Sequence, residues 1–280
     1  MVAQRHICTS KGVFARGLLL LGLLTLGGAV QACGPYRVAF YEFGLLYYRD
    51  LQGVARGIDL DVVDAVRERS GCRLDTWVDS RVRIWNQLAE GHLDVTVSGI
   101  PTAEREFHSE FMPYIYTRNM LVLRRGLPRE LKTPSGFLGA HDRRIAVVKG
   151  FKHGHFFDEW LDKLRTQGGR TVEAADFEAV VRLFKAGRVD AFLALPTSWI
   201  LAARRHDIES LAELQDWAPQ DRVIGSLVVS RHTVPEADRR RLRSAVLSLL
   251  ADGSIDAILR RHVGPDLAAT MRYLPPSADR

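Results

Sequence analysis

Two stretches of the 280-residue sequence share one pattern and indicate its fold: LAEGHLDV at residues 88–95 and, 96 residues later, FKAGRVDA at residues 184–191. In each, the end of an apolar-faced helix is followed by a glycine, which commonly terminates helices, and then by a strand-like apolar run. Pro-Thr follows each stretch within seven residues. The alternative is a chance resemblance between two common helix-to-strand turns, but the surrounding sequence favours a repeated unit.

Strands and helices alternate on both sides of these two stretches. Strands separated by helices at this spacing are typical of βαβ units and a parallel sheet. We therefore expect two α/β lobes with a cleft between them. The expected elements are strands at 36–43, 73–79, 93–99, 144–150 and 223–230, helices at 59–69 and 156–164, a short helix through Ile84 and Leu88 that Gly91 ends, a long helix opened by Thr233 and Pro235, and a last helix capped by Ser254 and ended by Gly264 and Pro265.

The composition is that of a globular protein. With 46% hydrophobic and 26% charged residues, a disordered chain, a collagen-like repeat and a polytopic membrane protein are all disfavoured. The net charge of +6 and the pI of 9.4 would suggest a nucleic-acid partner. The N-terminus weakens that suggestion.

The N-terminal segment is typical of a secretory signal. Three cations and no acid precede LLLLGLLTL at residues 18–26, and Val30 and Ala32 are small residues suited to cleavage before Cys33. The apolar run is too short to span about 30 Å of hydrocarbon. We therefore predict a signal peptide at residues 1–32 and a secreted protein. Its removal leaves 36 of the 39 Lys and Arg against 33 Asp and Glu, so no nucleic-acid partner is expected.

The cysteine count favours one disulfide. Of the three cysteines, Cys8 lies in the predicted signal, which leaves Cys33 and Cys72 as a pair in an oxidising compartment. The alternative is a lipoprotein acylated at Cys33, because residues 30–33 loosely resemble a lipobox. Gln31 fits that motif poorly, and acylation would leave Cys72 without a partner.

Seven segments along the chain carry a resemblance to a known family. In order, they are GIDLDVVDAVRERSG, LAEGHLDVTVSG, TAER, EFMPYIYTRNMLVLRR, RIAVVKG, AGRVDAFLALP and LADGSIDAILRRHVG. In this order they resemble the family 3 extracellular solute-binding proteins, the periplasmic receptors of polar amino-acid ABC importers. This resemblance implies a periplasmic location and a type II periplasmic binding protein, an α/β fold of two Rossmann-like lobes joined by two hinge strands. It places the first lobe at residues 33–123 and 226–280, the second at 124–225, and the hinge near Leu123 and Ser226.

The resemblance also implies a function. It indicates a monomeric receptor without cofactor or metal that captures a small carboxylate-bearing molecule, amino-acid-like or an organic acid, for an ABC permease. One alternative is an enzyme on the same fold, similar to cyclohexadienyl dehydratase, for which Glu42, His153 and Glu173 are the candidate acids or bases. Another is a ligand sensor that does not transport. We expect no catalytic residues.

The resemblance assigns the ligand contacts residue by residue. Thr102 and Arg105 match a Thr-x-x-Arg element that holds the ligand carboxylate, and a guanidinium suits this because it donates two parallel hydrogen bonds. Thr102 can also cap the short helix that TAERE begins. The alternative for Arg105 is a surface pair with Glu104 or Glu110. In the second lobe, residues 150–154 replace a Gly-Thr or Gly-Ser element of the family, so backbone N–H donors are expected there without the hydroxyl.

An aromatic residue, Tyr41 or Phe43, covers the ligand. The acid that pairs with a ligand ammonium is missing, because Leu195 stands at or beside its position. The predicted ligand-binding residues are Tyr41, Phe43, Arg81, Ser98, Gly99, Thr102, Arg105, Gly150, Phe151, His153 and Thr197.

Further cations lie near the predicted cleft. Arg81 and Arg83 follow the second strand, and Lys152 adjoins His153. An ordinary solvated position is the alternative for each arginine. His153 and His155 have no carboxylate or cysteine at metal-ligand spacing, so no metal is expected. The tryptophans 85, 160 and 199 sit in helical patterns, and we expect them mostly in cores.

Overall fold

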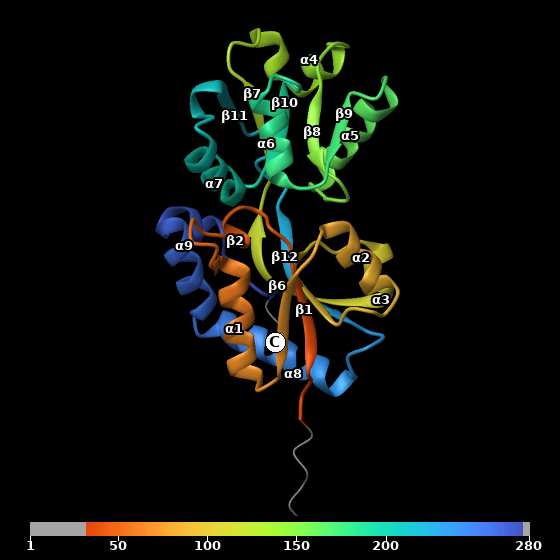
Figure 1. Cartoon of the computed structure of the whole chain (residues 1–280), viewed down its shortest axis with the longest axis vertical. Helices are drawn as coiled ribbons and strands as arrows, with labels where there is room; N and C mark the ends of the chain where they lie inside the picture. The colour runs from red at the N-terminus through yellow and green to blue at the C-terminus, as the bar shows by residue number, and fades with distance from the viewer. Residues whose placement is uncertain (1–31, 277–280) are drawn as a thin grey trace, which may run out of the picture. The chain divides into compact units, whose positions relative to one another are not determined.

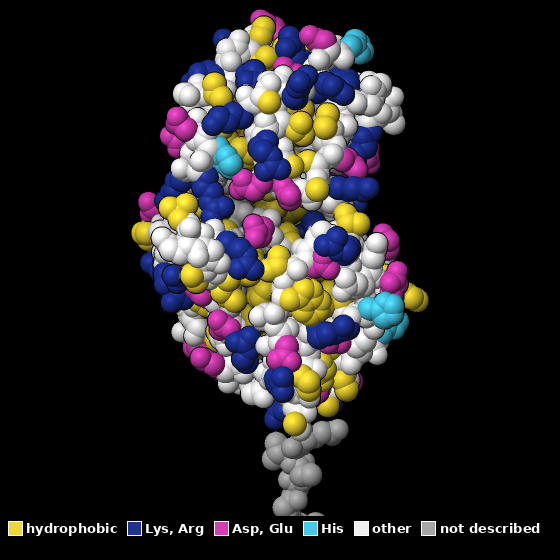
Figure 2. Space-filling model, in the orientation of Figure 1, with side chains coloured by type: hydrophobic (Ala, Val, Ile, Leu, Met, Phe, Trp, Pro, Cys, Tyr) yellow, Lys and Arg dark blue, Asp and Glu magenta, His cyan; other side chains and the backbone are white. Residues whose placement is uncertain are grey.

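The computed structural model describes residues 32–276, in which two five-stranded sheets form two α/β lobes (Figure 1). The predicted signal peptide falls on residues outside this part, except for Ala32. None of the helices in residues 32–276 is long and apolar enough to cross a membrane. Figure 2 shows Lys and Arg side chains interspersed with Asp and Glu over the viewed face.

The first sheet has the strand order β4-β1-β5-β12-β6. β1 runs parallel to both β4 and β5, whereas β12 runs antiparallel to β5 and β6. Every residue of β5 is buried, as expected for a central strand covered on both faces. The strands are β1 (Tyr36–Phe40), β4 (Leu74–Val78), β5 (Val95–Gly99), β6 (Ser109–Thr117) and β12 (Val223–Ser230), and a small hairpin adds β2 (Tyr48–Arg49) and β3 (Ala55–Arg56).

The second sheet has the strand order β11-β7-β10-β8-β9 and the same arrangement of parallel and antiparallel neighbours. β8 is parallel to β9 and β10, and β7 is antiparallel to β10 and β11. The strands are β7 (Met120–Arg124), β8 (Ile145–Val148), β9 (Thr171–Ala174), β10 (Ala191–Ala194) and β11 (Ala212–Gln215).

Helices cover the two sheets, and the longer helices bury apolar residues on one face. In α5, the buried residues Phe157, Trp160, Leu161 and Leu164 recur at helical spacing. The helices are α1 (Ile58–Ser70), α2 (Arg81–Ala89), α3 (Ala103–His108), α4 (Pro134–Gly139), α5 (His155–Thr166), α6 (Phe177–Lys185), α7 (Pro196–His206), α8 (Glu236–Ala251) and α9 (Ser254–Met271), with short 3-10 turns η1 (Gly44–Leu46), η2 (Arg129–Lys132) and η3 (Glu209–Leu211).

The repeated sequence pattern has the same structural role in both lobes. Gly91 and Gly187 each follow a helix with φ of +71°, a conformation that glycine adopts without steric cost. The aspartate that follows accepts a backbone hydrogen bond at the neighbouring strand: Asp94 from the Arg37 N–H and Asp190 from the Arg144 N–H. The two stretches are therefore equivalent in structure.

The last helix differs from the expectation. Gly253, with φ of +81°, is the N-cap of α9, and Ser254 is its first residue. The helix also continues past Gly264 and Pro265 to Met271, with a kink where Gly264 is non-helical. Proline is tolerated there because the kink begins a new helical turn, in which its missing N–H is not needed.

The chain passes between the sheets twice. β6 ends at Thr117 and β7 begins at Met120, so the first crossing is residues 118–119; the second is residues 216–222, between β11 and β12. The boundaries expected near Leu123 and Ser226 lie inside strands, where Leu123 pairs with Ala191 and Ser226 with Gly99. The apolar pattern of a strand does not indicate which sheet the strand joins, because this depends on the strands with which it forms backbone hydrogen bonds.

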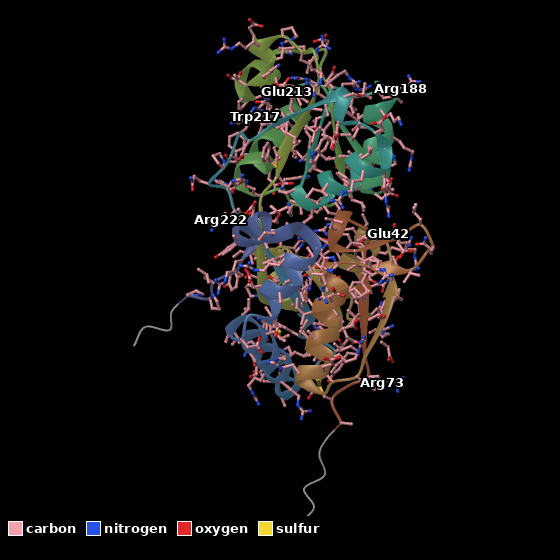
Figure 3. All side chains as sticks on the ribbon, turned by 90° about the vertical axis from the view of Figure 1, so that its left-hand side faces the viewer. Glu42, Arg73, Arg188, Glu213, Trp217 and Arg222 are labelled. Carbon is pink, nitrogen blue, oxygen red and sulfur yellow. A yellow bond between two sulfur atoms is a disulfide. The ribbon has the colours of Figure 1, made fainter. Side chains whose placement is uncertain are left out.

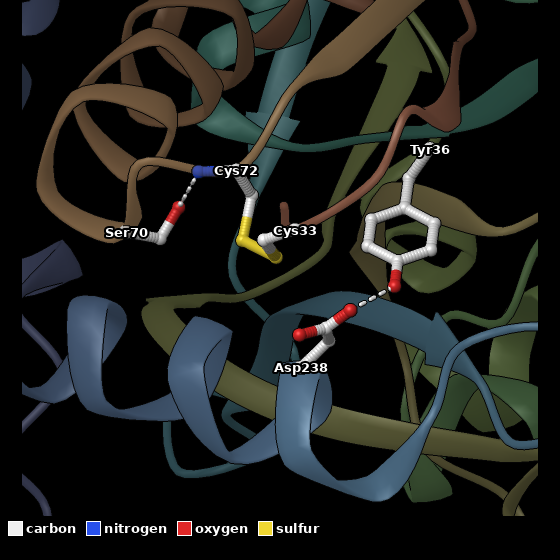
Figure 4. The surroundings of a disulfide bond; sticks show 5 residues. All are labelled: Cys33, Tyr36, Ser70, Cys72 and Asp238. Atoms are coloured by element: carbon white, nitrogen blue, oxygen red, sulfur yellow. Dashed lines mark hydrogen bonds between the residues drawn. A yellow bond between two sulfur atoms is a disulfide. The ribbon is translucent and has the colours of Figure 1, made fainter. Parts of the chain in front are cut away.

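A disulfide joins Cys33 to Cys72, as predicted, with a Cα–Cα distance of 4.5 Å (Figure 4). Both cysteines are buried at the starts of the adjacent parallel strands β1 and β4. Backbone hydrogen bonds from Arg73 to Cys33 and from Tyr36 to Arg73 continue this pairing. With its sulfur bonded to Cys72, Cys33 has no thiol for acylation.

Replacing Cys33 and Cys72 together by serine should lower the free energy of unfolding by about 4 kcal/mol, because the cross-link closes a loop with a sequence separation of 39 residues. Urea unfolding of the oxidised protein, the reduced protein and the double variant measures this, and the last two should coincide. Two free thiols, or a diacylglyceryl group on Cys33, in the intact mass would contradict the pairing.

Candidate functional site

Aromatic rings and an arginine join the two lobes. Phe43, which follows β1 in the first lobe, stacks on Phe151 of the second lobe, with ring centroids 4.7 Å apart and an interplanar angle of 11°. The Arg81 guanidinium lies 4.6 Å from the ring centroids of both Tyr41 and Phe151. These residues are all buried. The predicted residues Tyr41, Phe43, Arg81 and Phe151 therefore form one cluster.

Arg105 lies beside this cluster and also connects the lobes. Thr102 caps α3 by accepting the Arg105 N–H, as the sequence predicted. The guanidinium donates to the carbonyl oxygens of Ile100, at 3.0 Å, and of Gly150 in the second lobe, at 3.3 Å. It also lies 3.7 Å from the ring centroid of Trp85.

The alternative for Arg105, a surface pair with Glu104 or Glu110, is not what the structure shows. Glu110 is paired with Arg239 and Arg243, and the hydrogen bonds of Arg105 go to backbone carbonyls. The described residues give Arg105 no ion-pair partner within 4.0 Å. A carboxylate from outside could therefore pair with it.

Two guanidinium groups share one oxygen at this point. Arg81 Nε approaches the Gly150 carbonyl oxygen at 3.5 Å, and Arg105 Nη2 approaches the same oxygen. Burial, together with the charge of Arg81, lowers the pKa of Arg105 to about 10. Arg105 therefore remains cationic at neutral pH, and the neighbouring guanidinium of Arg81 adds to the positive charge of the site.

Three hollows open around this contact between the lobes. A hollow of about 250 Å³ is lined by Tyr41, Phe43 and Arg81, and one of about 360 Å³ by Trp85, Arg105 and Gly150. The third, of about 340 Å³, is lined by Thr102 and Arg222 among others. In Figure 3, Glu42 of the first hollow and Arg222 of the third project on opposite sides.

Ser98 and Gly99 are the last two residues of β5 and lie beneath the site. Ser98 adopts a left-handed backbone, with φ of +47°, and its hydroxyl donates to Asp59 at 2.9 Å. Its carbonyl accepts a hydrogen bond from the Tyr41 hydroxyl. At Gly99, a Cβ would lie 2.1 Å from a Val228 methyl group, so packing requires glycine there.

The predicted residues of the second lobe divide into two groups. Gly150 and Phe151 join the cluster, although Gly150 offers its carbonyl oxygen rather than the N–H expected from the sequence. His153 is buried beside Asp158, and burial lowers its pKa although Asp158 opposes the shift. Thr197 is fully buried where α7 packs against η1, with no hydrogen-bond partner for its hydroxyl in the described structure.

The candidate catalytic residues do not share a hollow. Glu42 lines the hollow of Arg81, Glu173 lines that of Arg105, and His153 lines none of the three. Glu42 is also paired with Arg49 at 3.8 Å. Within residues 32–276, no three His, Cys, Asp or Glu side chains are grouped to hold a metal ion.

The exposure of the two arginines of α2 and of the three tryptophans agrees with the sequence predictions only in part. Arg83 pairs with Asp79 and its side chain is 68% exposed, whereas Arg81 is buried. Trp160 is in the core and Trp199 is partly buried against it. Trp85 also packs partly against the core, but it lies under Arg105 in a hollow. The position of Trp85 in the helical pattern did not predict this contact, because helical periodicity does not show which face of a helix meets another lobe.

Sequence reasoning missed Asp59. It lies in the first turn of α1, is buried, and accepts hydrogen bonds from Ser98 and from Tyr114 at 2.6 Å. Burial raises its pKa to about 7, and the two hydrogen bonds only partly oppose this. An aspartate at the start of a helix is usually solvated, so nothing in the sequence distinguished it.

Two α/β lobes that meet over a cleft containing buried cations and aromatic rings define a two-lobed binding protein. The chain belongs to the bacterial extracellular solute-binding proteins, family 3, whose family model matches residues 39–265. No curated protein matches the chain in sequence.

Solved structures share the fold at low identity. An ancestral arginine-binding protein bound to arginine is 18% identical, with a TM-score of 0.68 over 82% of this chain and 98% of that chain. The arginine-, lysine-, histidine-binding protein ArtJ from Geobacillus stearothermophilus is 19% identical, with a TM-score of 0.68 over 84% and 98%. A histidine kinase sensor domain is 16% identical, with a TM-score of 0.67 over 84% and 96%.

Asp59→Asn should remove a pH dependence of stability. Because the folded-state pKa of about 7 is above the ordinary 3.8, the folded protein retains a proton that the unfolded chain loses. The free energy of unfolding should therefore fall as pH rises between about 4 and about 7, by at most about 1.4 kcal/mol per pH unit. The asparagine oxygen can still accept both hydrogen bonds, so the variant should lack this decline.

Urea unfolding at pH values from about 4 to about 8 measures the effect. Asp75→Asn, on the half-exposed strand β4, is the matched control and should keep the wild-type slope. Equal slopes for wild type and Asp59→Asn would show that Asp59 is already ionised in the folded protein.

Proposed function

We propose that the protein is a periplasmic receptor that captures a small carboxylate-bearing solute between its lobes and presents it to an ABC permease. The observation that supports this most directly is Arg105, whose buried guanidinium has carbonyl acceptors but no carboxylate partner within residues 32–276. A bidentate, charge-assisted pair with a ligand carboxylate would be stronger than these contacts to neutral carbonyls.

The proposed ligand needs an acid group but no amino group. Leu195, where an acid would pair with an ammonium, is buried and serves as the N-cap of α7. Arg81 and Arg105 would also repel a cationic ligand, because like charges interact strongly where water is excluded. An organic acid therefore fits the site better than a basic amino acid.

The two alternative functions are an enzyme and a ligand sensor that does not transport. An enzyme would need an acid and a base that are free to act on one substrate, but Glu42 is paired with Arg49 and His153 is buried beside Asp158. A sensor without transport would use the same ligand site, and a histidine kinase sensor domain shares the fold. Only the protein partner separates a sensor from an importer receptor.

Arg105→Ala should weaken binding of an organic acid at least about thirty-fold, because a buried bidentate contact is lost. The probes are butyrate, valerate, succinate, glutarate and adipate, and the measurement is isothermal titration calorimetry with the acid that wild type binds most tightly. Arg83→Ala, which removes an exposed arginine in the first turn of α2, is the control and should bind as wild type does. Wild-type affinity in Arg105→Ala would contradict the proposal.

Binding of that acid should also be accompanied by closure of the lobes. Two crossings, at residues 118–119 and 216–222, allow hinge motion of the kind that periplasmic binding proteins use around ligands. Small-angle scattering of the protein with and without the acid should show a smaller radius of gyration on binding. An unchanged radius would indicate a rigid cleft and would favour the enzyme alternative.

A further inference from the structure

Arg81 is a buried cation whose hydrogen-bonding capacity is unused. The residue is 3% exposed, and neither of its terminal nitrogens, Nη1 and Nη2, has a partner in the described structure. Its one hydrogen bond, from Nε to the Gly150 carbonyl, is 3.5 Å long, beyond the usual range. Arginine cannot escape this by losing its proton, so the charge is left in place.

The other deeply buried arginines show what a purely structural role looks like. Arg170, also 3% exposed, donates from all three guanidinium nitrogens to the carbonyls of Arg143, Leu138 and Phe137. Arg239 likewise donates from all three. Stacking between Tyr41 and Phe151 holds the Arg81 guanidinium but gives its N–H groups no acceptor.

No acid among the described residues forms an ion pair with Arg81 within 4.0 Å. Four acids line its hollow, and each already has another partner: Glu42 pairs with Arg49, Asp79 with Arg83, and Glu178 with His206, while Asp176 caps α6. The hollow therefore presents a positive group whose counter-charge must come from outside.

We propose that Arg81 forms a second anion subsite next to Arg105, so that the ligand is a short dianion with one acid group on each arginine. This inference rests on the proposed function and deepens it by naming the ligand class. Both guanidinium groups contact the Gly150 carbonyl oxygen, which places the two subsites close together. A dianion would neutralise both charges and supply the acceptors that Arg81 lacks.

Matched pairs of acids test this directly. Succinate, glutarate and adipate are compared by calorimetry with butyrate, valerate and hexanoate, which have the same chain lengths and one acid group. In at least one pair, wild type should bind the dianion at least about thirty-fold more tightly. Arg81→Met, which keeps the apolar bulk between the two rings, should reduce that preference to about three-fold or less. Arg83→Met is the matched control and should keep it.

The outcomes separate this inference from the proposed function. Equal binding of monoanion and dianion by wild type, or an unchanged preference in Arg81→Met, overturns the second subsite and leaves the carboxylate receptor standing. If no acid of either series binds, mass spectrometry of the molecule released from the denatured protein decides. Two acid groups support both proposals, one acid group overturns the dianion alone, and no acid group or no released molecule overturns both.

Discussion

The candidate site depends on one buried carboxyl group beneath it. Asp59 accepts hydrogen bonds from Ser98 and Tyr114, and the Tyr114 hydroxyl in turn accepts the Ser98 N–H. This network holds Ser98 in a left-handed conformation that non-glycine residues seldom adopt, at the point where β5 leaves the sheet. The direction of the chain there fixes Thr102, and Thr102 fixes the start of the helix that presents Arg105.

The contact between the lobes is built from weak, reversible interactions. Phe43 stacks on Phe151, and Arg105 donates to a carbonyl of the opposite lobe. An aromatic pair of this kind contributes about 0.5–1.5 kcal/mol beyond its buried area. Such a contact can position the lobes without preventing their separation, which suits a protein that must admit and release a solute.

Arg81 and Arg105 are two buried guanidinium groups without an ion-pair partner among the described residues. Burying a charge without a partner costs several kcal/mol, and the same chain satisfies Arg170 and Arg239 completely where no ligand is needed. The cost falls at the meeting of the lobes, where a bound anion could offset it. The buried positive charge would then explain both the selectivity for acids and a lower stability of the protein without its ligand.

The sequence alone was sufficient for the α/β class, the repeated lobe, the disulfide and the cap of α3. These follow from local rules: helical and strand periodicity, glycine after a helix, and the pairing of two cysteines in an oxidising compartment. It also selected most of the residues that the cleft brings together, through their match to family motifs. The tertiary structure alone decided that β7 joins the second sheet, that Trp85 lies under Arg105, that Asp59 is buried, and that the terminal nitrogens of Arg81 lack acceptors in the described structure while Arg83 is solvated. Each of these depends on which face of an element meets a segment distant in sequence, and periodicity records the apolar face of an element without recording its partner.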